Sequence, residues 1–199
     1  MILKRLFDLV IVIPSLIVLF PIFLVLAALI KFDSQGPVFF RQIRVGKGGN
    51  NFPIFKFRTM VVDAETRGIQ ISTSQDSRIT QVGAFLRKYK LDEFPQLINV
   101  LVGEMSLVGP RPEVPKYVAH YPLDVKDKVL SVKPGITDLA SIKFSNENEM
   151  LEGVDDVEKE YIEKILPIKL RYYVDYAEKH SLIGDFKIIM MTILKILRH

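Results

Sequence analysis

The chain has 199 residues, is 49% hydrophobic and 25% charged, and carries a formal net charge of +4. This length favours one domain with appendages. It contains no cysteine, which excludes disulfides and thiolate metal sites, and its three histidines lack ligand spacing, which argues against a zinc site. The basic residues are denser before Asp92, a balance that suits anionic lipid, nucleotide or nucleic acid equally well.

The first predicted element is a long apolar helix. Asp8 is the only charge between Leu6 and Ile30, and the uncharged run from Leu9 to Ile30 is long enough for a transmembrane helix. A signal peptide is disfavoured, because the run is too long and no small-x-small cleavage site precedes polar sequence.

Two features bear on how this helix meets a membrane. Pro14 and Pro21 each remove a backbone donor and kink a helix. Basic residues flank the run on both sides, at Lys4 and Arg5 before it and from Lys31 after it. The positive-inside rule therefore places both flanks in the cytoplasm, which a re-entrant helix satisfies. A single span and a buried core helix remain the alternatives.

The next predicted element is a β-hairpin, with strands at 38–45 and 53–60 and a turn at 48–51. In the second strand Lys56 and Arg58 share a face, because side chains alternate along a strand. Such a pair can contact phosphate, although an ordinary solvated face explains it as well.

The remaining elements follow from capping and turn residues. We expect a polar surface loop at 61–76, a helix capped by Thr80 and running to Tyr89, and a helix that Asp92 opens and Gly103 ends. Further along we expect a non-helical segment at 106–112, short helices at 115–118 and 125–132, a turn at 133–137, and a long helix at 154–180 bent at Pro167.

The last predicted element is an amphipathic helix at 186–198. Lys187, Thr192, Lys195 and Arg198 cluster broadly on one side of it. This pattern is typical of a helix lying in a membrane interface, and a helix that packs on the core explains it nearly as well.

The adjacent acids Asp92 and Glu93 are the main candidate for chemistry. Taken alone, they are well explained as a helix cap and a favourable first-turn charge. The basic run of Arg87, Lys88 and Lys90 would keep such a pair ionised, and a helix start offers amide groups to an anion. Gly109 to Pro112 holds Arg111 in a rigid turn, which suits phosphate or sugar, although a surface salt bridge is the simpler explanation.

Four motifs occur in order: KFRTM at 56–60, KLDEFPQLINVL at 90–101, GEMSLVGPRPE at 103–113 and KPGIT at 133–137. With the N-terminal membrane segment and the C-terminal helices, they make essentially the whole chain resemble the bacterial sugar transferases. These are small monotopic phosphoglycosyl transferases of the undecaprenyl-phosphate pathway.

The resemblance implies an α+β fold in two parts. Residues 1–32 would form a re-entrant helix-break-helix, and residues 33–199 a cytoplasmic, membrane-apposed catalytic domain of a small β-hairpin and several short helices, ending in an interfacial amphipathic helix. The break maps to Pro21, where this chain has Phe20 in place of the serine of many relatives, and Pro14-Ser15 can share in the bend.

The resemblance also implies a reaction. A phospho-sugar would pass from a UDP-sugar to a polyprenyl (undecaprenyl) phosphate, releasing UMP, by a ping-pong mechanism with a covalent intermediate on Asp92. Glu93 would assist as a base or position the metal and acceptor, and Mg²⁺, with Asp92 as its ligand, would neutralise the diphosphate. The phosphate contacts would be Arg58, Arg87 and Arg111, with Lys56 a weaker candidate.

The implied location is the cytoplasmic face of the bacterial inner membrane, in contact with its lipid, and a homodimer is compatible with it. The sugar stays open, because Ser141 stands where many relatives have glutamine. The competing hypotheses are a membrane-anchored protein that binds anionic lipid through its basic face, and a nucleic-acid binder. The second is disfavoured because no recognisable motif interleaves basic and exposed aromatic residues.

Overall fold

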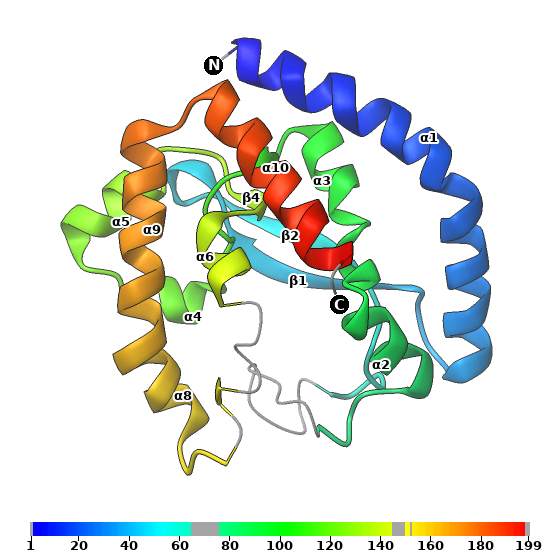
Figure 1. Ribbon diagram of the computed structural model, residues 1–199. Coiled ribbons are helices and arrows are strands. Elements are labelled where there is room, and N and C mark those ends of the chain that lie inside the picture. Colours follow the sequence, from blue (N-terminus) through cyan, green and yellow to red (C-terminus); the bar gives the residue numbers. More distant parts are fainter. Residues whose placement is uncertain (1, 65–75, 145–149, 152, 198–199) are drawn as a thin grey trace.

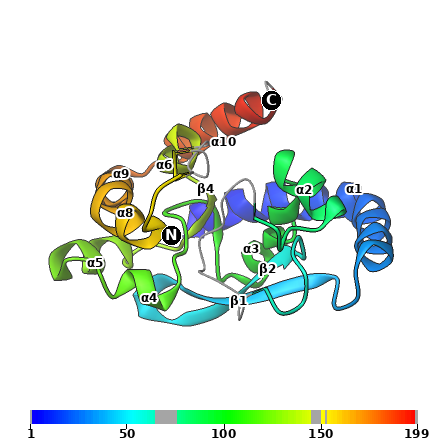
Figure 2. The same cartoon turned by 90° about the horizontal axis from the view of Figure 1, so that it is seen from below.

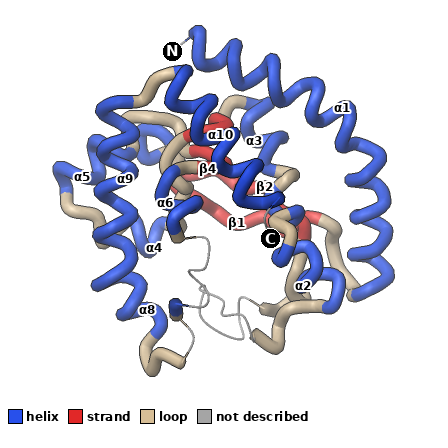
Figure 3. The backbone as a smooth tube through the Cα atoms, viewed as in Figure 1, coloured by secondary structure: helices blue, strands red, loops and turns tan. Residues whose placement is uncertain are grey.

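A computed structural model describes residues 2–64, 76–144, 150–151 and 153–197. It is a mixed helix and sheet structure, as predicted, with short strands at its centre and helices around them (Figure 3). Most of the predicted loop at 61–76 lies outside the described residues. The elements are α1 (Ile2–Asp33), β1 (Phe39–Val45), η1 (Lys47–Gly49), β2 (Asn51–Phe57), α2 (Gln81–Lys88), η2 (Leu91–Glu93), α3 (Gln96–Val102), β3 (Ser106–Val108), α4 (Pro115–Val118), α5 (Leu123–Val129), β4 (Gly135–Thr137), α6 (Leu139–Lys143), α8 (Val157–Glu160), η3 (Tyr161–Ile165), α9 (Leu166–Lys179) and α10 (Leu182–Leu197).

The N-terminal helix α1 is continuous through both prolines. The predicted break at Pro21 is therefore wrong as a break in the helix; Figure 1 shows instead that α1 curves along the top and one side of the molecule. A proline removes one backbone donor and clashes with the preceding turn, which bends a helix without ending it when neighbouring bonds persist. The helix is long and apolar enough to cross a membrane, with a mean hydropathy of 3.1 in its most apolar window.

The predicted hairpin is confirmed. Strands β1 and β2 pair antiparallel, from Phe39 opposite Phe57 to Val45 opposite Asn51. The second strand begins two residues earlier than expected and ends at Phe57, where the side chain of Arg58 turns to the end of α1. In Figure 2 the hairpin and α10 lie at opposite edges of the molecule.

Helix α2 is capped as predicted, since the Thr80 hydroxyl accepts from the Gly83 amide at 3.0 Å. The next prediction is wrong: Asp92 does not cap a helix. It lies inside the 3₁₀ turn η2, which follows a left-handed Lys90 (φ 56°), and α3 begins only at Gln96. Pro95 fits there because the first turn of a helix needs no donor from it. Gly103 ends α3 at φ 93°, as expected.

Two short parallel strands, β3 and β4, were not predicted; their residues were expected to be non-helical and a turn. Gly109, directly after β3, lies so close to Gly135, the first residue of β4, and to the turn before it that only glycine fits at either position. A Cβ on Gly109 would lie 2.4 Å from the Lys133 carbonyl oxygen, and one on Gly135 would lie 2.1 Å from the Gly109 nitrogen. This contact fixes where the chain leaves β3 towards Arg111.

The predicted helix at 154–180 is instead three consecutive helical segments, α8, η3 and α9. The irregular part is a π-helical turn at Tyr161–Ile165, directly before Pro167, which sits in the first turn of α9. The irregularity thus lies beside the proline that predicted it, because the proline nitrogen cannot donate to the preceding turn.

The C-terminal helix α10 packs on the core through one face and exposes apolar side chains on the other. Asp185 and Ile188 are buried, and α10 contacts α6, β3 and β4. The Thr192 hydroxyl lies 2.6 Å from that of Thr137, so Thr192 faces the core and does not group with Lys187. The outer face exposes large apolar residues: Ile183, Phe186, Met190, Met191, Ile193 and Leu194.

Candidate active site

Glu93 is held by two cations. Its Oε1 accepts from Lys56 Nζ at 2.7 Å and from Arg111 Nη2 at 2.6 Å, and its Oε2 lies 3.3 Å from Arg111 Nη1. Lys56 comes from β2, Glu93 from η2 and Arg111 from the loop after β3. The fork of the guanidinium matches the carboxylate, so the contact fixes geometry as well as charge. The structure thus brings Lys56 and Arg111, two of the residues named as phosphate contacts, to the acid pair.

Asp92 lies on the same turn and has no partner among the described residues. It is half-buried, and within the described part of the chain its carboxylate accepts no hydrogen bond and forms no ion pair. The charges nearest to it include those of Glu93, Lys56, Arg87 and Lys90. A carboxylate in cationic surroundings but without a hydrogen-bond partner is available to a ligand.

The pKa values of Asp92 and Glu93 are consequently shifted in opposite directions. Burial, and then the charge of Glu93, raise the pKa of Asp92, while Lys56, Arg87 and Lys90 oppose that rise. Burial also acts to raise the pKa of Glu93, but Arg111 and Lys56 outweigh it and hold that pKa well below its usual value. The environment therefore separates two adjacent acids, which is typical of sites where they have different roles.

Arg87 lies close to the pair. Its Nε donates to the Thr59 hydroxyl at 2.9 Å, and its charge acts on Asp92. Helix α2, which carries it, packs tightly on the chain after β2, since a Cβ on Gly83 would lie 2.1 Å from the Thr59 carbonyl oxygen. Lys88 and Lys90 of the same basic run are exposed.

Arg58 is not brought to the acid pair. Its Nη2 donates to the carbonyl oxygens of Ser34 at 2.7 Å and Ile30 at 3.3 Å, and its Nη1 to that of Gln35 at 2.5 Å. These groups lie at the end of α1, where carbonyls lack helical partners. The structure therefore places Arg58 as a cap of the apolar helix, bonded to residues 30, 34 and 35.

Sequence reasoning missed a second buried carboxylate, Glu113. Its Oε1 accepts from the Tyr161 hydroxyl at 2.7 Å and lies 3.8 Å from Lys169 Nζ, and its Oε2 lies 3.8 Å from Arg44 Nη1. We call Arg44, Glu113, Tyr161 and Lys169 the Glu113 cluster. The only signal was Glu113 itself, at the end of the Gly-Pro-Arg-Pro turn, since its partners are far apart in sequence.

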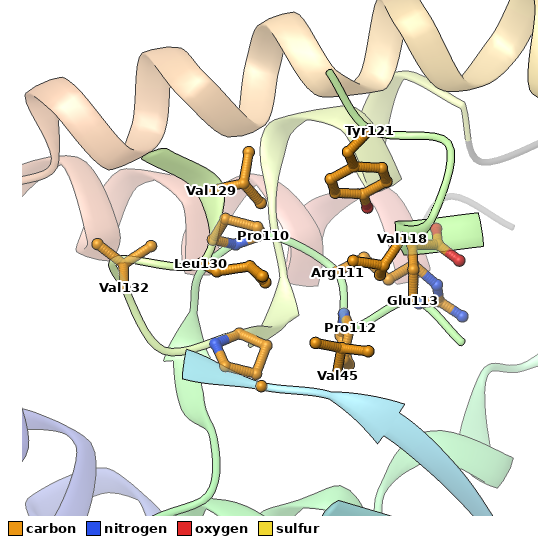
Figure 4. A pocket seen from close by; sticks show the side chains of 12 residues that line it. Val45, Pro110, Arg111, Pro112, Glu113, Val118, Tyr121, Val129, Leu130 and Val132 are labelled. Atoms are coloured by element: carbon orange, nitrogen blue, oxygen red, sulfur yellow. The ribbon is translucent and has the colours of Figure 1, made fainter. Parts of the chain in front are cut away.

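A small pocket adjoins the loop of Arg111, on the side of Val45 and Tyr121 (Figure 4). Arg111 and Glu113 both line it. Because Arg111 binds Glu93 and Glu113 binds Tyr161, this loop connects the acid pair with the Glu113 cluster. Ser141 lies in α6, where its amide and hydroxyl donate to Asp138 at 3.0 and 2.5 Å. This serine completes the cap of α6.

The chain offers few ligands to a metal. Across residues 2–64, 76–144, 150–151 and 153–197, no cluster of three or more histidines and acids could hold an ion. Magnesium, however, is commonly bound by one or two carboxylates together with substrate phosphates and water. The unpaired carboxylate of Asp92 fits that pattern, whereas Glu93 is occupied by Arg111 and Lys56.

The family model of the bacterial sugar transferases matches residues 1–199. A UDP-glucose:undecaprenyl-phosphate glucose-1-phosphate transferase of Xanthomonas campestris pv. campestris is 39% identical over 98% of this chain and 38% of its own length. A UDP-N-acetylgalactosamine-undecaprenyl-phosphate N-acetylgalactosaminephosphotransferase of Aeromonas hydrophila is 36% identical over 98% of this chain and 43% of its own length.

The chain thus spans about two fifths of the length of these two relatives. A shorter relative, the uncharacterized sugar transferase EpsL of Bacillus subtilis (strain 168), is 37% identical over 99% of this chain and 88% of its own length. With the family model matching from end to end, the chain belongs to the bacterial sugar transferase family.

Proposed function

We propose that this protein is a phosphoglycosyl transferase, which moves a phospho-sugar from a UDP-sugar to a polyprenyl phosphate and releases UMP. The observation that carries the proposal is the unpaired carboxylate of Asp92 beside the clamped carboxylate of Glu93. The names of the relatives support the donor and acceptor classes. They name two different sugars, so the donor is a question for experiment.

In the proposed mechanism Asp92 is the nucleophile. One carboxylate oxygen attacks the β-phosphorus of the donor, the bond to the bridging oxygen breaks, and UMP leaves with the electron pair. An oxygen of the polyprenyl phosphate then attacks the same phosphorus and Asp92 leaves, which gives the polyprenyl diphospho-sugar. A covalent intermediate of this kind divides one difficult transfer into two easier ones.

Glu93 suits positioning better than base catalysis. A carboxylate whose pKa lies well below the usual value is a weak proton acceptor. Its contacts with Lys56 and Arg111 instead hold two cations beside Asp92, where the phosphates of a donor would lie. The acceptor phosphate is already anionic at neutral pH and needs little help from a base.

We propose Mg²⁺ as the cofactor, with Asp92 as its protein ligand. When bound, it would neutralise the diphosphate and improve UMP as a leaving group. Arg87 and Arg111 are the proposed phosphate contacts, because both place positive charge beside Asp92.

The proposed location is the cytoplasmic face of the cell membrane, with α1 re-entrant. Both ends of α1 are bound to the same body: Arg5 donates to the carbonyl oxygens of Val100 and Leu101 at one end, and Arg58 to that of Ser34 at the other. A body on one side of a bilayer cannot hold both ends of a helix that spans it. The exposed apolar residues of α1 and α10 support contact with lipid.

The activity is tested with purified protein in nanodiscs containing polyprenyl phosphate. A panel of UDP-sugars is screened for UMP release with and without Mg²⁺. We expect release from at least one donor, dependent on both Mg²⁺ and acceptor, and an adduct of a phospho-sugar on Asp92 by mass spectrometry when acceptor is omitted. Absence of UMP release from every donor would overturn the proposal.

The topology is tested with single cysteines, since the natural chain has none. Ile2→Cys and Asn50→Cys are treated with a membrane-impermeant maleimide in intact cells and after permeabilisation. The re-entrant helix predicts that both label only after permeabilisation. Labelling of Ile2→Cys alone in intact cells would establish a full span instead.

A further inference from the structure

The first two turns of α1 are tied to both segments that carry the candidate site. Asp8, the only charge in the apolar run, is 2% exposed although α1 as a whole shows its side chains to the outside. The proposed chemistry at Asp92 does not use it. A buried carboxylate is expensive unless it is hydrogen-bonded, so its partners indicate what it stabilises.

Asp8 binds the start of β3. Its two carboxylate oxygens accept from the Ser106 hydroxyl at 3.0 and 2.8 Å, and one of them also accepts from the Leu107 amide at 3.2 Å. Ser106 is fully buried, and its own amide donates to the Pro134 carbonyl at 2.9 Å. The strand is therefore held between α1 on one side and the loop before β4 on the other.

A second tie reaches the next residue of β3. Lys4 Nζ lies 2.5 Å from Asp185, and the Tyr176 hydroxyl lies 2.8 Å from both Asp185 and the Val108 carbonyl oxygen. All three residues of β3 are thus linked to α1: Ser106 and Leu107 directly, and Val108 through Asp185 and Tyr176. The chain then passes Gly109, which lies too close to the Lys133 carbonyl to admit a Cβ, and reaches Arg111.

A third tie reaches the other half of the site. Arg5 donates to the carbonyl oxygens of Val100 at 2.5 Å and Leu101 at 2.8 Å, in the last turn of α3. Helix α3 follows directly after the turn that carries Asp92 and Glu93. One turn of α1 therefore contacts the element behind the acid pair, and the next contacts the element that leads to Arg111.

We propose that Asp8 is a positioning residue, which acts through β3 to set Arg111 against Glu93. This inference rests on the proposed function. The apolar helix is accordingly part of the frame of the site as well as its membrane attachment: Asp8 and Arg5 fix the separation between the loop of Arg111 and the turn of Asp92. Small displacements of a catalytic group cost rate steeply, roughly a hundredfold for about 1 Å.

The test is a double-mutant cycle on UMP release in nanodiscs. Asp8→Asn keeps the size of the side chain, and we expect it to reduce kcat/KM roughly tenfold, through a misplaced Arg111. Because Asp8 acts through Arg111, Asp8→Asn should cost much less in an Arg111→Lys background. Losses that multiply would overturn the proposal. Ser15→Ala is the matched control, since among the described residues that hydroxyl donates to the Ile11 carbonyl within α1 and to no other group.

Amide hydrogen exchange tests, without any substrate, whether Asp8 stabilises β3 and the loop after it. We expect the amides of residues 105–113 to exchange faster in Asp8→Ala than in the natural protein, with β1 and β2 unchanged. Equal acceleration of exchange in both regions would show that Asp8 contributes to general stability. Unchanged exchange at residues 105–113 would show that Asp8 does not stabilise β3. Either result overturns the inference. Failure of the proposed function would give a different result, the absence of UMP release from the natural protein.

Discussion

Two carboxylate clusters flank the loop of Arg111, and they differ in whether they contain a carboxylate without a hydrogen-bond partner among the described residues. In the Glu113 cluster the carboxylate is 6% exposed and a tyrosine and two cations surround it. On the turn of residues 91–93, Glu93 is likewise clamped by two cations, but its neighbour Asp92 has no partner within the described residues. Both clusters place a carboxylate among cations, and only one presents an unpaired acid.

The difference separates two uses of the same chemistry. An internally satisfied cluster fixes the structure around it, and removing one member leaves a buried charge unpaired. An unpaired carboxylate beside a satisfied one keeps its lone pairs for a ligand, while the neighbouring cations remain fixed nearby. We therefore expect mutations in the two clusters to separate activity from stability.

The largest effect is expected from Asp92→Asn. The amide keeps the size of the side chain and removes the nucleophile, so UMP release should fall at least roughly a thousandfold, as for other nucleophile deletions. Thermal unfolding should hardly change, because Asp92 makes no hydrogen bond to the described residues. Asp175→Asn, on the exposed face of α9, is the control. Full activity in Asp92→Asn would remove Asp92 from the mechanism.

Glu113→Ala should do the reverse. It leaves Lys169 and Arg44 without their shared carboxylate in a buried cluster, and breaking such a cluster typically costs about 3–5 kcal/mol of unfolding free energy. Chemical denaturation in detergent measures this loss, and UMP release per folded molecule should stay within a few-fold of the natural value. A stable but inactive Glu113→Ala protein would mean that the clusters are not separable in this way.

Gly109→Ala tests the link between the clusters. Its new Cβ would lie 2.4 Å from the Lys133 carbonyl oxygen, so the two loops must separate and carry Arg111 with them. Overpacking of this kind costs roughly 1–3 kcal/mol. We expect a raised KM for the donor together with this loss of stability. Gly49→Ala is the comparison, since nothing lies within 4 Å of its Cβ, although its φ of 80° adds local strain. An unchanged KM in Gly109→Ala would show that the loop contact does not place Arg111.

The sequence predicted local features well where one residue type dictates the backbone. The hairpin, the Thr80 cap and the end of α3 at Gly103 follow from alternation, a hydroxyl and a glycine. The parallel pair β3–β4 was beyond such reasoning, because its strands are short and their pairing depends on contact between segments far apart in sequence. The break at Pro21 was expected from the family resemblance, whereas α1 stays helical through both prolines, because a proline bends a helix without ending it when neighbouring bonds persist.

The candidate site was predicted unevenly for a similar reason. Asp92, Glu93, Lys56 and Arg111 were each named from the sequence, and the structure brings them together. Arg58 shares a motif with Lys56 but turns to the end of α1, because β2 ends at Phe57 and the alternation of the strand no longer governs the next residue. No local pattern states which charge a distant helix end will bind. Asp8 was visible as a lone charge, and only the fold shows that Ser106 and Leu107 are its partners.

The pH dependence of UMP release gives the smallest expected effect and the closest comparison of the two acids on the turn. The nucleophile must be ionised, so activity should fall as pH drops through the pKa of Asp92, which burial and Glu93 raise above the ordinary value of about 3.9. Glu93→Gln removes the charge of Glu93 and frees Lys56 and Arg111 to act on Asp92. Both changes lower the pKa of Asp92, so the acidic limb of the residual activity should move to lower pH. A limb that stays in place would show that the two carboxylates do not interact, and the clamp on Glu93 would then serve stability alone.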